Sequence, residues 1–250
     1  MSVGSVLGLH SSRRRIWVFV SLIIMVLIAF LCIYAVIVNR ESLHNKWEPV
    51  VEIQVGTEEE LRNAINDLPL RGSAIIILTA DIYLTDSFLM IPADKNVTLT
   101  SNKTNGFYKL FGTMSSGASL TGPCVIGVSG VLMLDGVVVT HAVGSEGRGV
   151  WVFNGGHFVM YRGEISGNTA VYDGLISNTT YVGGGVCNEG VFEMYGGVIS
   201  GNTAYSGGGV YNYIGVFEMY GGVIFGNTSH YGGDVYNYMG VFEMYGGMVE

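Results

Sequence analysis

The stretch GGGVCNEGVFEMYGGVISGNTA (residues 183–204) is followed by GGGVYNYIGVFEMYGGVIFGNTS (residues 207–229) and then by GGDVYNYMGVFEMYGGMVE (residues 232–250). One unit of roughly 25 residues therefore occurs three times in succession. Self-similarity at such a period is the signature of a solenoid, in which each repeat forms one coil and stacks on the next. These three copies predict a solenoid with one coil per copy.

The spacing within the copies separates a constant strand from a variable connector. Phe192, Phe217 and Phe242 recur at intervals of 25 residues, whereas Val186 and Val210 lie 24 residues apart. The difference arises because the connector NEG of the first copy is one residue shorter than the connectors NYIG and NYMG of the next two. We therefore expect strands of fixed length joined by turns of variable length.

More divergent copies precede these three. GVLMLDGVVVT places Leu132 where Phe192 stands, and GGHFVMYRGEISGNTA places Phe158 at the same position. Residues 171–182 exceed the period and are predicted to form a loop inserted between strands. Clear repeats are therefore expected over residues 130–250.

The repeated strand GVFEMYGG indicates which side chains are buried. Side chains alternate across a strand, so Phe and Met share one face while Glu and Tyr share the other. Burying a large apolar side chain stabilises a fold by about 1.5–3 kcal/mol, whereas burying an unpaired carboxylate is strongly unfavourable. Phe and Met are therefore expected to face inward. Stacked coils would align them in two ladders, Phe158, Phe192, Phe217, Phe242 and Met160, Met194, Met219, Met244.

The same alternation places Glu and Tyr side chains on the outer surface. The candidate binding residues are Glu193, Tyr195, Glu218, Tyr220, Glu243 and Tyr245. Adjacent coils would hold the carboxylates about 4.8 Å apart. Tyr offers a flat apolar body and a polar tip, which suits contact with sugars or proteins. Repetition alone also generates such a row, and exposed Tyr also favours the pleated surface of a strand.

An Asn recurs in the turn of each copy, within SGNT or FGNT. These residues are Asn168, Asn202 and Asn227. Stacked coils would align them as an amide ladder that satisfies backbone groups of the turn. The alternative is that each Asn tolerates a left-handed backbone conformation. Both alternatives make these residues structural.

An apolar stretch near the amino terminus predicts a membrane span. Residues 16–38 carry no formal charge, and at about 1.5 Å per residue they would form a helix long enough to cross a bilayer core of about 30 Å. A signal peptide has a shorter apolar core, so an uncleaved anchor is expected. Residues 1–15 end in three Arg and are predicted to lie in the cytoplasm. Residues 39–49 would link the span to a domain on the other side.

Residues 57–68 have the pattern of a short helix. Thr57 and Glu60 show the spacing of a capping box, and the apolar residues that follow fall on one helical face. Such a helix could cover the open end of a β-structure and shield its first strand. From Ala74 the period becomes that of strands. Residues 50–250 are therefore predicted to form an all-β domain with one capping helix.

Charge and cysteine content exclude several classes of function. After Pro49 the chain has seven Lys or Arg and eighteen Asp or Glu, a net charge of −11, which disfavours nucleic acid as a partner. Three cysteines do not make a disulfide framework, although a bond between Cys124 and Cys187 stays open. Motifs for phosphate binding, a Ser nucleophile or zinc are missing. No catalytic residue, cofactor or metal site is therefore predicted.

The unit GGGVYN followed by GVFEMYGGVISGNTA resembles the repeat of adhesin-like microbial surface proteins, including autotransporters, that fold as right-handed parallel β-helices. The opening from Val50, a helix followed by strands, is similar to the amino-terminal cap of pectin-lyase-like folds. The resemblance implies right-handed coils with three short parallel strands each, and a role at the cell surface. The third copy stops at Glu250 inside a coil, without the capping element that the family pattern would lead us to expect. We accordingly expect a truncated copy with an open strand edge at this end. Such an edge would favour end-to-end association.

These observations predict a single-pass, membrane-anchored β-helix outside the cell, with a non-enzymatic role in adhesion or in the cell envelope. Its partners would be the membrane and a surface glycan or protein. The alternative is a carbohydrate-active enzyme, a polysaccharide lyase or glycoside hydrolase of the pectin-lyase-like kind. Such an enzyme needs two carboxylates about 5 to 9.5 Å apart, and the outward Glu row is the candidate.

Overall fold

The computed structural model describes residues 50–85, 87–113, 123–170 and 182–250, and these lie in one compact unit, Glu48–Glu250. Residues 16–38, predicted to span a membrane, and residues 171–181 of the predicted inserted loop fall outside the described part. Among the helices that the structure describes, none has the length and apolar character needed to cross a bilayer.

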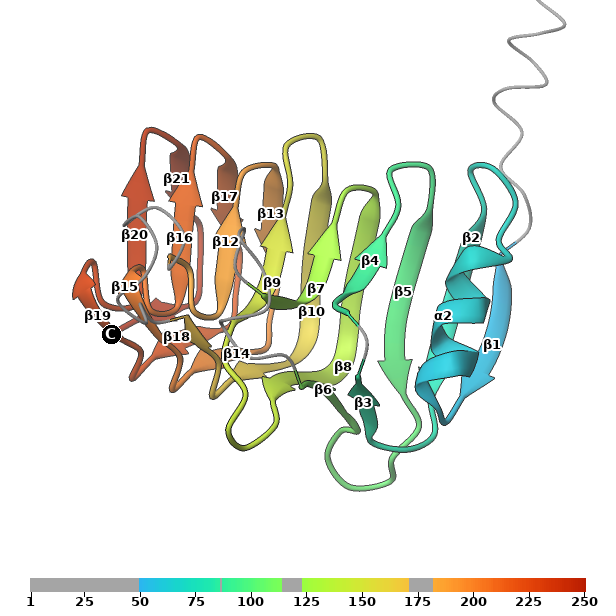
Figure 1. The fold of residues 1–250 in the computed structure, drawn as a ribbon. Helices are drawn as coiled ribbons and strands as arrows, with labels where there is room; N and C mark the ends of the chain where they lie inside the picture. The colour runs from blue at the N-terminus through green and yellow to red at the C-terminus, as the bar shows by residue number, and fades with distance from the viewer. Residues whose placement is uncertain (1–49, 86, 114–122, 171–181) are drawn as a thin grey trace, which may run out of the picture. The chain divides into compact units, whose positions relative to one another are not determined.

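The described unit is a right-handed parallel β-solenoid of about seven coils with little helix (Figure 1). Its strands stack into three long faces because each coil repeats the same order of strands. The first face consists of β1 (Val51–Val55), β2 (Ser73–Leu78), β5 (Asn96–Ser101), β8 (Val131–His141), β10 (His157–Ser166), β13 (Val191–Met194), β17 (Val216–Met219) and β21 (Val241–Met244).

The long strands β8 and β10 continue from the first face onto the second, where their later residues pair with shorter strands. The other members of the second face are β3 (Ile82–Leu84), β6 (Lys109–Gly112), β14 (Val198–Ser200), β18 (Val223–Phe225) and β22 (Met248–Val249). The third face consists of β4 (Leu89–Ile91), β7 (Cys124–Val128), β9 (Arg148–Val152), β12 (Val186–Asn188), β16 (Val210–Tyr213) and β20 (Val235–Tyr238).

The carboxyl-terminal coils carry one strand more than the three expected. The strands β11 (Thr169–Ala170), β15 (Thr203–Ser206) and β19 (Thr228–Tyr231) form a separate three-stranded sheet. They follow directly on the turns that contain the recurring Asn. The expectation of three strands per coil is therefore wrong for these coils, because the residues after each turn are extended and find partners in the neighbouring coils.

Register confirms the predicted stacking of the core ladders, but the expected burial holds only up to β17. In β21, Phe242 is partly buried and Met244 is 47% exposed. Phe192 pairs in register with Phe217, and the next coil adds Phe242. The stacked Phe rings have centroids 4.6 Å and 4.8 Å apart in these two pairs. Phe158, Phe192, Phe217 and the matching Met residues of these three coils are completely buried. Leu132 occupies the Phe position in β8, so the divergent repeat is confirmed from residue 130 onward.

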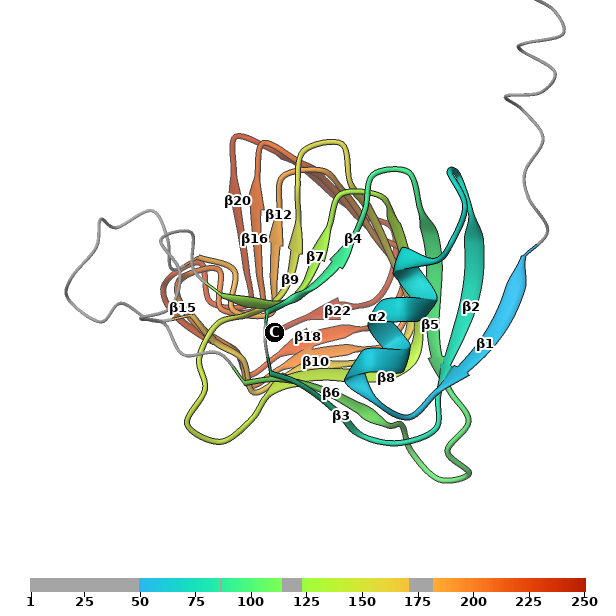
Figure 2. The same cartoon turned by 45° about the vertical axis from the view of Figure 1, so that its right-hand side comes forward.

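The predicted helix is present as α2 (Glu58–Asn66). Thr57 and Glu60 form the predicted capping box, in which each side chain accepts a hydrogen bond from the other residue's backbone N–H. Leu61, Ala64 and Ile65 are buried and join the core. In Figure 2, α2 lies over the end of the solenoid interior beside β1 and β2. The helix therefore shields the apolar core at this end.

Candidate binding face

The outer surface of β13, β17 and β21 carries three parallel rows of side chains. Each strand contributes a Val, a Glu and, just after its end, a Tyr, and the registered pairing of the strands aligns them. The Glu row is Glu193, Glu218 and Glu243, and the Tyr row is Tyr195, Tyr220 and Tyr245. The structure thus brings the six predicted candidate residues together on one face.

Each Tyr of this face donates a hydrogen bond to the Glu two residues earlier in the same coil. The distance from the Tyr195 hydroxyl to Glu193 Oε2 is 2.8 Å, and that from the Tyr220 hydroxyl to Glu218 Oε2 is 3.2 Å. Tyr245 donates to its own Glu in the same way. These bonds fix the carboxylates and hydroxyls as one repeated polar unit per coil.

His157 stands at the amino-terminal end of the Glu row. Its Nε2 donates to Glu193 Oε1 at 2.9 Å, so Glu193 has both a cationic neighbour, when His157 is protonated, and a Tyr donor. Glu218 and Glu243 each receive the Tyr bond. Glu193 therefore differs from Glu218 and Glu243 in having an imidazole as a hydrogen-bond donor.

The Tyr rings stack on one another along the solenoid. The centroid of Tyr195 lies 5.3 Å from that of Tyr161 and 4.8 Å from that of Tyr220, and Tyr245 continues the stack at 5.0 Å. Ring faces inside the stack therefore contact other rings, and the ring edges and hydroxyls are what a ligand would meet. The sequence-based expectation of a flat apolar surface on every Tyr needs this correction.

The hydrogen bonds to carboxylates keep these phenols protonated. The hydrogen bond that Tyr195 donates to Glu193 raises the pKa of Tyr195 to about 12, and the bond that Tyr245 donates to Glu243 raises the pKa of Tyr245 to about 12. Burial together with the bond to Glu218 raises the pKa of Tyr220. At neutral pH the face thus presents neutral hydroxyl groups beside carboxylates.

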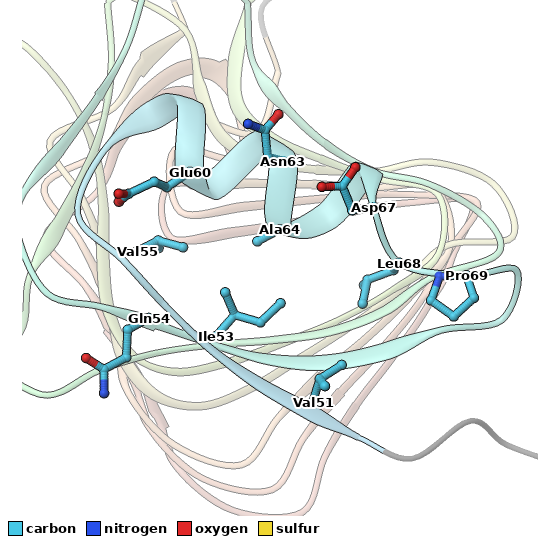
Figure 3. A pocket seen from close by; sticks show the side chains of 10 residues that line it. All are labelled: Val51, Ile53, Gln54, Val55, Glu60, Asn63, Ala64, Asp67, Leu68 and Pro69. Carbon is cyan, nitrogen blue, oxygen red and sulfur yellow. The ribbon is translucent and has the colours of Figure 1, made fainter.

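A second feature is a shallow hollow of about 450 Å³ between β1 and α2 (Figure 3). Its floor is apolar and includes Ile53 and Leu68, and its rim is polar and includes Asn63 and Asp67. Glu60 also lines it, but its carboxylate accepts hydrogen bonds from the Gly56 and Thr57 backbone N–H groups, which lower its pKa. That carboxylate has a structural role as a helix cap. The hollow could hold a small apolar group.

The recurring Asn residues form the amide ladder, so the first of the two alternatives is confirmed. Asn168 Nδ2 donates to Asn202 Oδ1 at 2.9 Å, and Asn202 Nδ2 donates to Asn227 Oδ1 at 2.9 Å. The left-handed conformation belongs instead to the Gly before each Asn, for example Gly201 with φ +62°. Asn202 also donates to the Ile165 carbonyl, so the ladder satisfies turn backbone groups.

Two ionisable residues that the sequence did not connect terminate this ladder. His141 Nδ1 lies 2.9 Å from Asn168 Oδ1, and Asn227 Nδ2 donates to Asp234 Oδ1 at 2.7 Å. Asp234 occupies the third position of a triplet that reads GGG in the other copies. That departure was a signal that could have identified it. His141 and Asp234 thus stand at the two ends of a chain of three amides, of which Asn168 and Asn202 are buried.

A second amide ladder was not predicted. Asn188 Nδ2 donates to Asn212 Oδ1, and Asn212 Nδ2 donates to Asn237 Oδ1, both at 2.7 Å. In the earlier coils this inward position of the third face is apolar, with Val152 in register with Asn188. The Asn recurring in VCN and VYN was the available sequence signal.

The disulfide left open between Cys124 and Cys187 is not formed. Both thiols are free and buried. Burial raises the pKa of Cys124 to about 12 and that of Cys187 to about 11. Because the thiolate is the reactive form, both side chains are inert packing groups.

Within the described ranges, no group of three or more His, Cys, Asp or Glu is arranged to hold a metal ion. Asp135 instead forms an ion pair with Arg162, with 2.5 Å between Asp135 Oδ1 and Arg162 Nε. Comparison with known protein families, with curated proteins and with solved structures returns no match in any of the three.

Proposed function

We propose that this chain is a non-enzymatic, membrane-anchored β-solenoid that displays the Glu and Tyr rows at a cell surface for adhesion. The observation that carries the proposal is the repeated Tyr–Glu unit, aligned in register on three successive coils. A surface with one polar unit per coil matches a linear polymer better than a compact ligand. The resemblance to adhesin-like β-helix repeats and the apolar residues 16–38 support the location.

The chemistry of the face favours a polymer that carries cationic or hydrogen-bond-donating groups. Carboxylates accept hydrogen bonds and attract positive charge, and the predicted solenoid has a net charge of −11. Stacking of the Tyr rings leaves their edges and hydroxyls accessible. Amino-bearing glycans and basic polypeptides have the complementary groups.

A binding array tests this proposal. The full-length chain in detergent is applied to immobilised neutral glycans, amino-bearing glycans and basic polypeptides. The triple variant Glu193→Gln, Glu218→Gln, Glu243→Gln should bind on the order of tenfold more weakly, since each exposed ion pair contributes roughly 0.5 kcal/mol.

A matched control removes three acidic charges at the other end of the solenoid, through Glu52→Gln, Glu59→Gln and Asp67→Asn. These residues are exposed and lie on β1, α2 and the end of α2. The control should retain parental binding. Equal loss in both triple variants would mean that overall charge, and not this face, determines binding.

The second candidate is a carbohydrate-active enzyme. It is favoured by the registered Glu row, because adjacent parallel strands lie about 4.8 Å apart and retaining glycosidases place their carboxylates about 5–5.5 Å apart. Against it, acid and base normally need different environments, whereas Glu218 and Glu243 accept the same Tyr bond. Release of oligosaccharides that Glu218→Gln abolishes would establish the enzyme and contradict the adhesive proposal.

A further inference from the structure

The one-residue difference between the repeat connectors has a structural consequence. The longer connectors join β16 to β17 and β20 to β21 (Figure 1). In them the additional residue has a left-handed backbone, with φ +54° at Ile214 and φ +60° at Met239. The shorter connector after β12 contains no non-Gly residue of this kind. The longer turns thus each hold one bulky apolar residue in a conformation that suits Gly or Asn.

These strained turns are fixed in place. The Ile214 backbone N–H donates to the Tyr238 carbonyl at 3.1 Å, so one turn is hydrogen-bonded to the next. The following Gly215 cannot be exchanged for a larger residue, because a Cβ there would collide with the Asn188 side-chain amide. Among the residues that the structure describes, Arg71 is the one other non-Gly residue with positive φ.

The strained residues are also exposed. Ile214 is 50% and Met239 76% accessible, and Tyr213 and Tyr238 beside them are 38% and 43% accessible. The two Tyr rings stack with centroids 5.8 Å apart. Strained backbone conformations are often retained at functional sites. Packing of Ile214 and Met239 into the core does not explain the strain here, because both side chains are exposed.

We propose that Tyr213, Ile214, Tyr238 and Met239 form a ridge that inserts into the interface of a lipid bilayer. The eight-residue segments VYNYIGVF and VYNYMGVF that contain the ridge carry no charge. Tyr prefers the membrane interface because its ring is apolar and its hydroxyl stays hydrated. Ile and Met at convex tips enter the acyl boundary, as the apolar face of an interfacial helix does.

The neighbouring shorter connector shows that the apolar tip is not imposed by the fold. There Glu189 occupies the turn and accepts a hydrogen bond from Trp151 Nε1 at 3.2 Å. A charged tip is therefore compatible with the coil. The ridge is limited to the two coils in which the inserted residue is present. The proposed anchoring would hold the chain at a bilayer, so this inference rests in part on the proposed function.

Fluorescence quenching by lipids tests the ridge. The full-length chain is reconstituted in phosphatidylcholine vesicles with and without brominated acyl chains, as the Met239→Trp variant and as the control Val143→Trp. Val143 is fully exposed in the loop between β8 and β9. After subtraction of the parental emission, bromolipid should quench the Trp at position 239 at least twofold more than the Trp at position 143.

A second substitution separates lipid contact from folding. Ile214→Asn in the Met239→Trp background removes one apolar tip while placing a residue that accepts the left-handed conformation. Ile214→Asn should reduce the quenching of the Trp at position 239 without lowering the midpoint of thermal unfolding. The control Val143→Asn in the same background should leave this quenching unchanged.

Flotation of the vesicles reports anchoring independently. If the chain floats but the Trp residues at positions 239 and 143 are quenched equally, the ridge does not insert into the bilayer. The partner of these exposed residues would then be a protein. A chain that neither floats nor is quenched overturns both the ridge and the anchor.

Discussion

His141 is the residue whose environment departs most from what its type would suggest. It is buried, its Nδ1 donates to the amide ladder, and its Nε2 is the one buried side-chain polar atom without a hydrogen-bond partner among the described residues. Burial lowers the pKa of His141, more than the Asn168 bond and nearby Glu146 raise it. The folded state therefore favours the neutral imidazole.

This environment predicts that the free energy of unfolding depends on His141 protonation. An unfolded His titrates near 6.5, so as pH falls the unfolded chain binds this proton before the folded chain does. The stability that neutral His141 contributes is complete above about pH 6.5 and is lost as pH falls toward the lowered folded pKa. Urea unfolding of the parent and of His141→Gln, from about pH 8 to about pH 5, measures it. Parallel curves for the two proteins would contradict this account.

At the scale of the element, one strand places two aromatic ladders in opposite environments. Phe217 lies inside β17 and is completely buried, whereas Tyr220 just beyond it is 40% exposed. Both stack on equivalent rings of the neighbouring coils. The same repetition therefore produces a buried ladder on one side of the strand and an exposed ladder on the other. We expect the buried ladder to contribute more to the free energy of unfolding.

Substitutions of Phe217 in β17 and of Tyr220 just after it measure this difference between the inner and outer ladders. Phe217→Ala should lower the free energy of unfolding by about 3–5 kcal/mol, because a large side chain is removed from a packed interior. Tyr220→Ala should lower it by about 1 kcal/mol, the value of an exposed aromatic contact. Denaturant titration of both variants measures the two free energies of unfolding. A larger decrease for Tyr220→Ala than for Phe217→Ala would contradict the assignment of inner and outer faces.

The alternation in GVFEMYGG was sufficient to predict both ladders, because strand period and burial preference determine side-chain direction. The capping box at Thr57 was predictable because it is local in sequence. The partnership of His141 and Asp234 with the Asn ladder was not, since those contacts join positions that differ in their place within the repeat. Stacking of the Tyr rings also depends on side-chain rotamers, which a pattern does not specify.

At the scale of the whole molecule, the predicted anchor and the solenoid would divide the chain between two environments. Residues 16–38 carry no formal charge, whereas the part after Pro49 has a net charge of −11. Three Arg precede the span, and Arg40 and Lys46 after it are offset by Glu41 and Glu48. Basic residues remain on the cytoplasmic side of a span.

This asymmetry predicts that protease added outside intact cells digests the solenoid and spares the amino terminus. Replacing Arg13, Arg14 and Arg15 with Gln should increase the protected, inverted fraction, because the orienting charge is removed from within about 15–20 residues of the span. The control replaces Lys103, Lys109 and Arg162, which lie in the solenoid beyond that distance, and should not alter protection. Protection patterns are read with tags at the two ends of the chain. Release of the parent from membranes by alkaline extraction would contradict the anchor itself, whereas an unchanged orientation in the Arg variant would contradict the role of the Arg triplet.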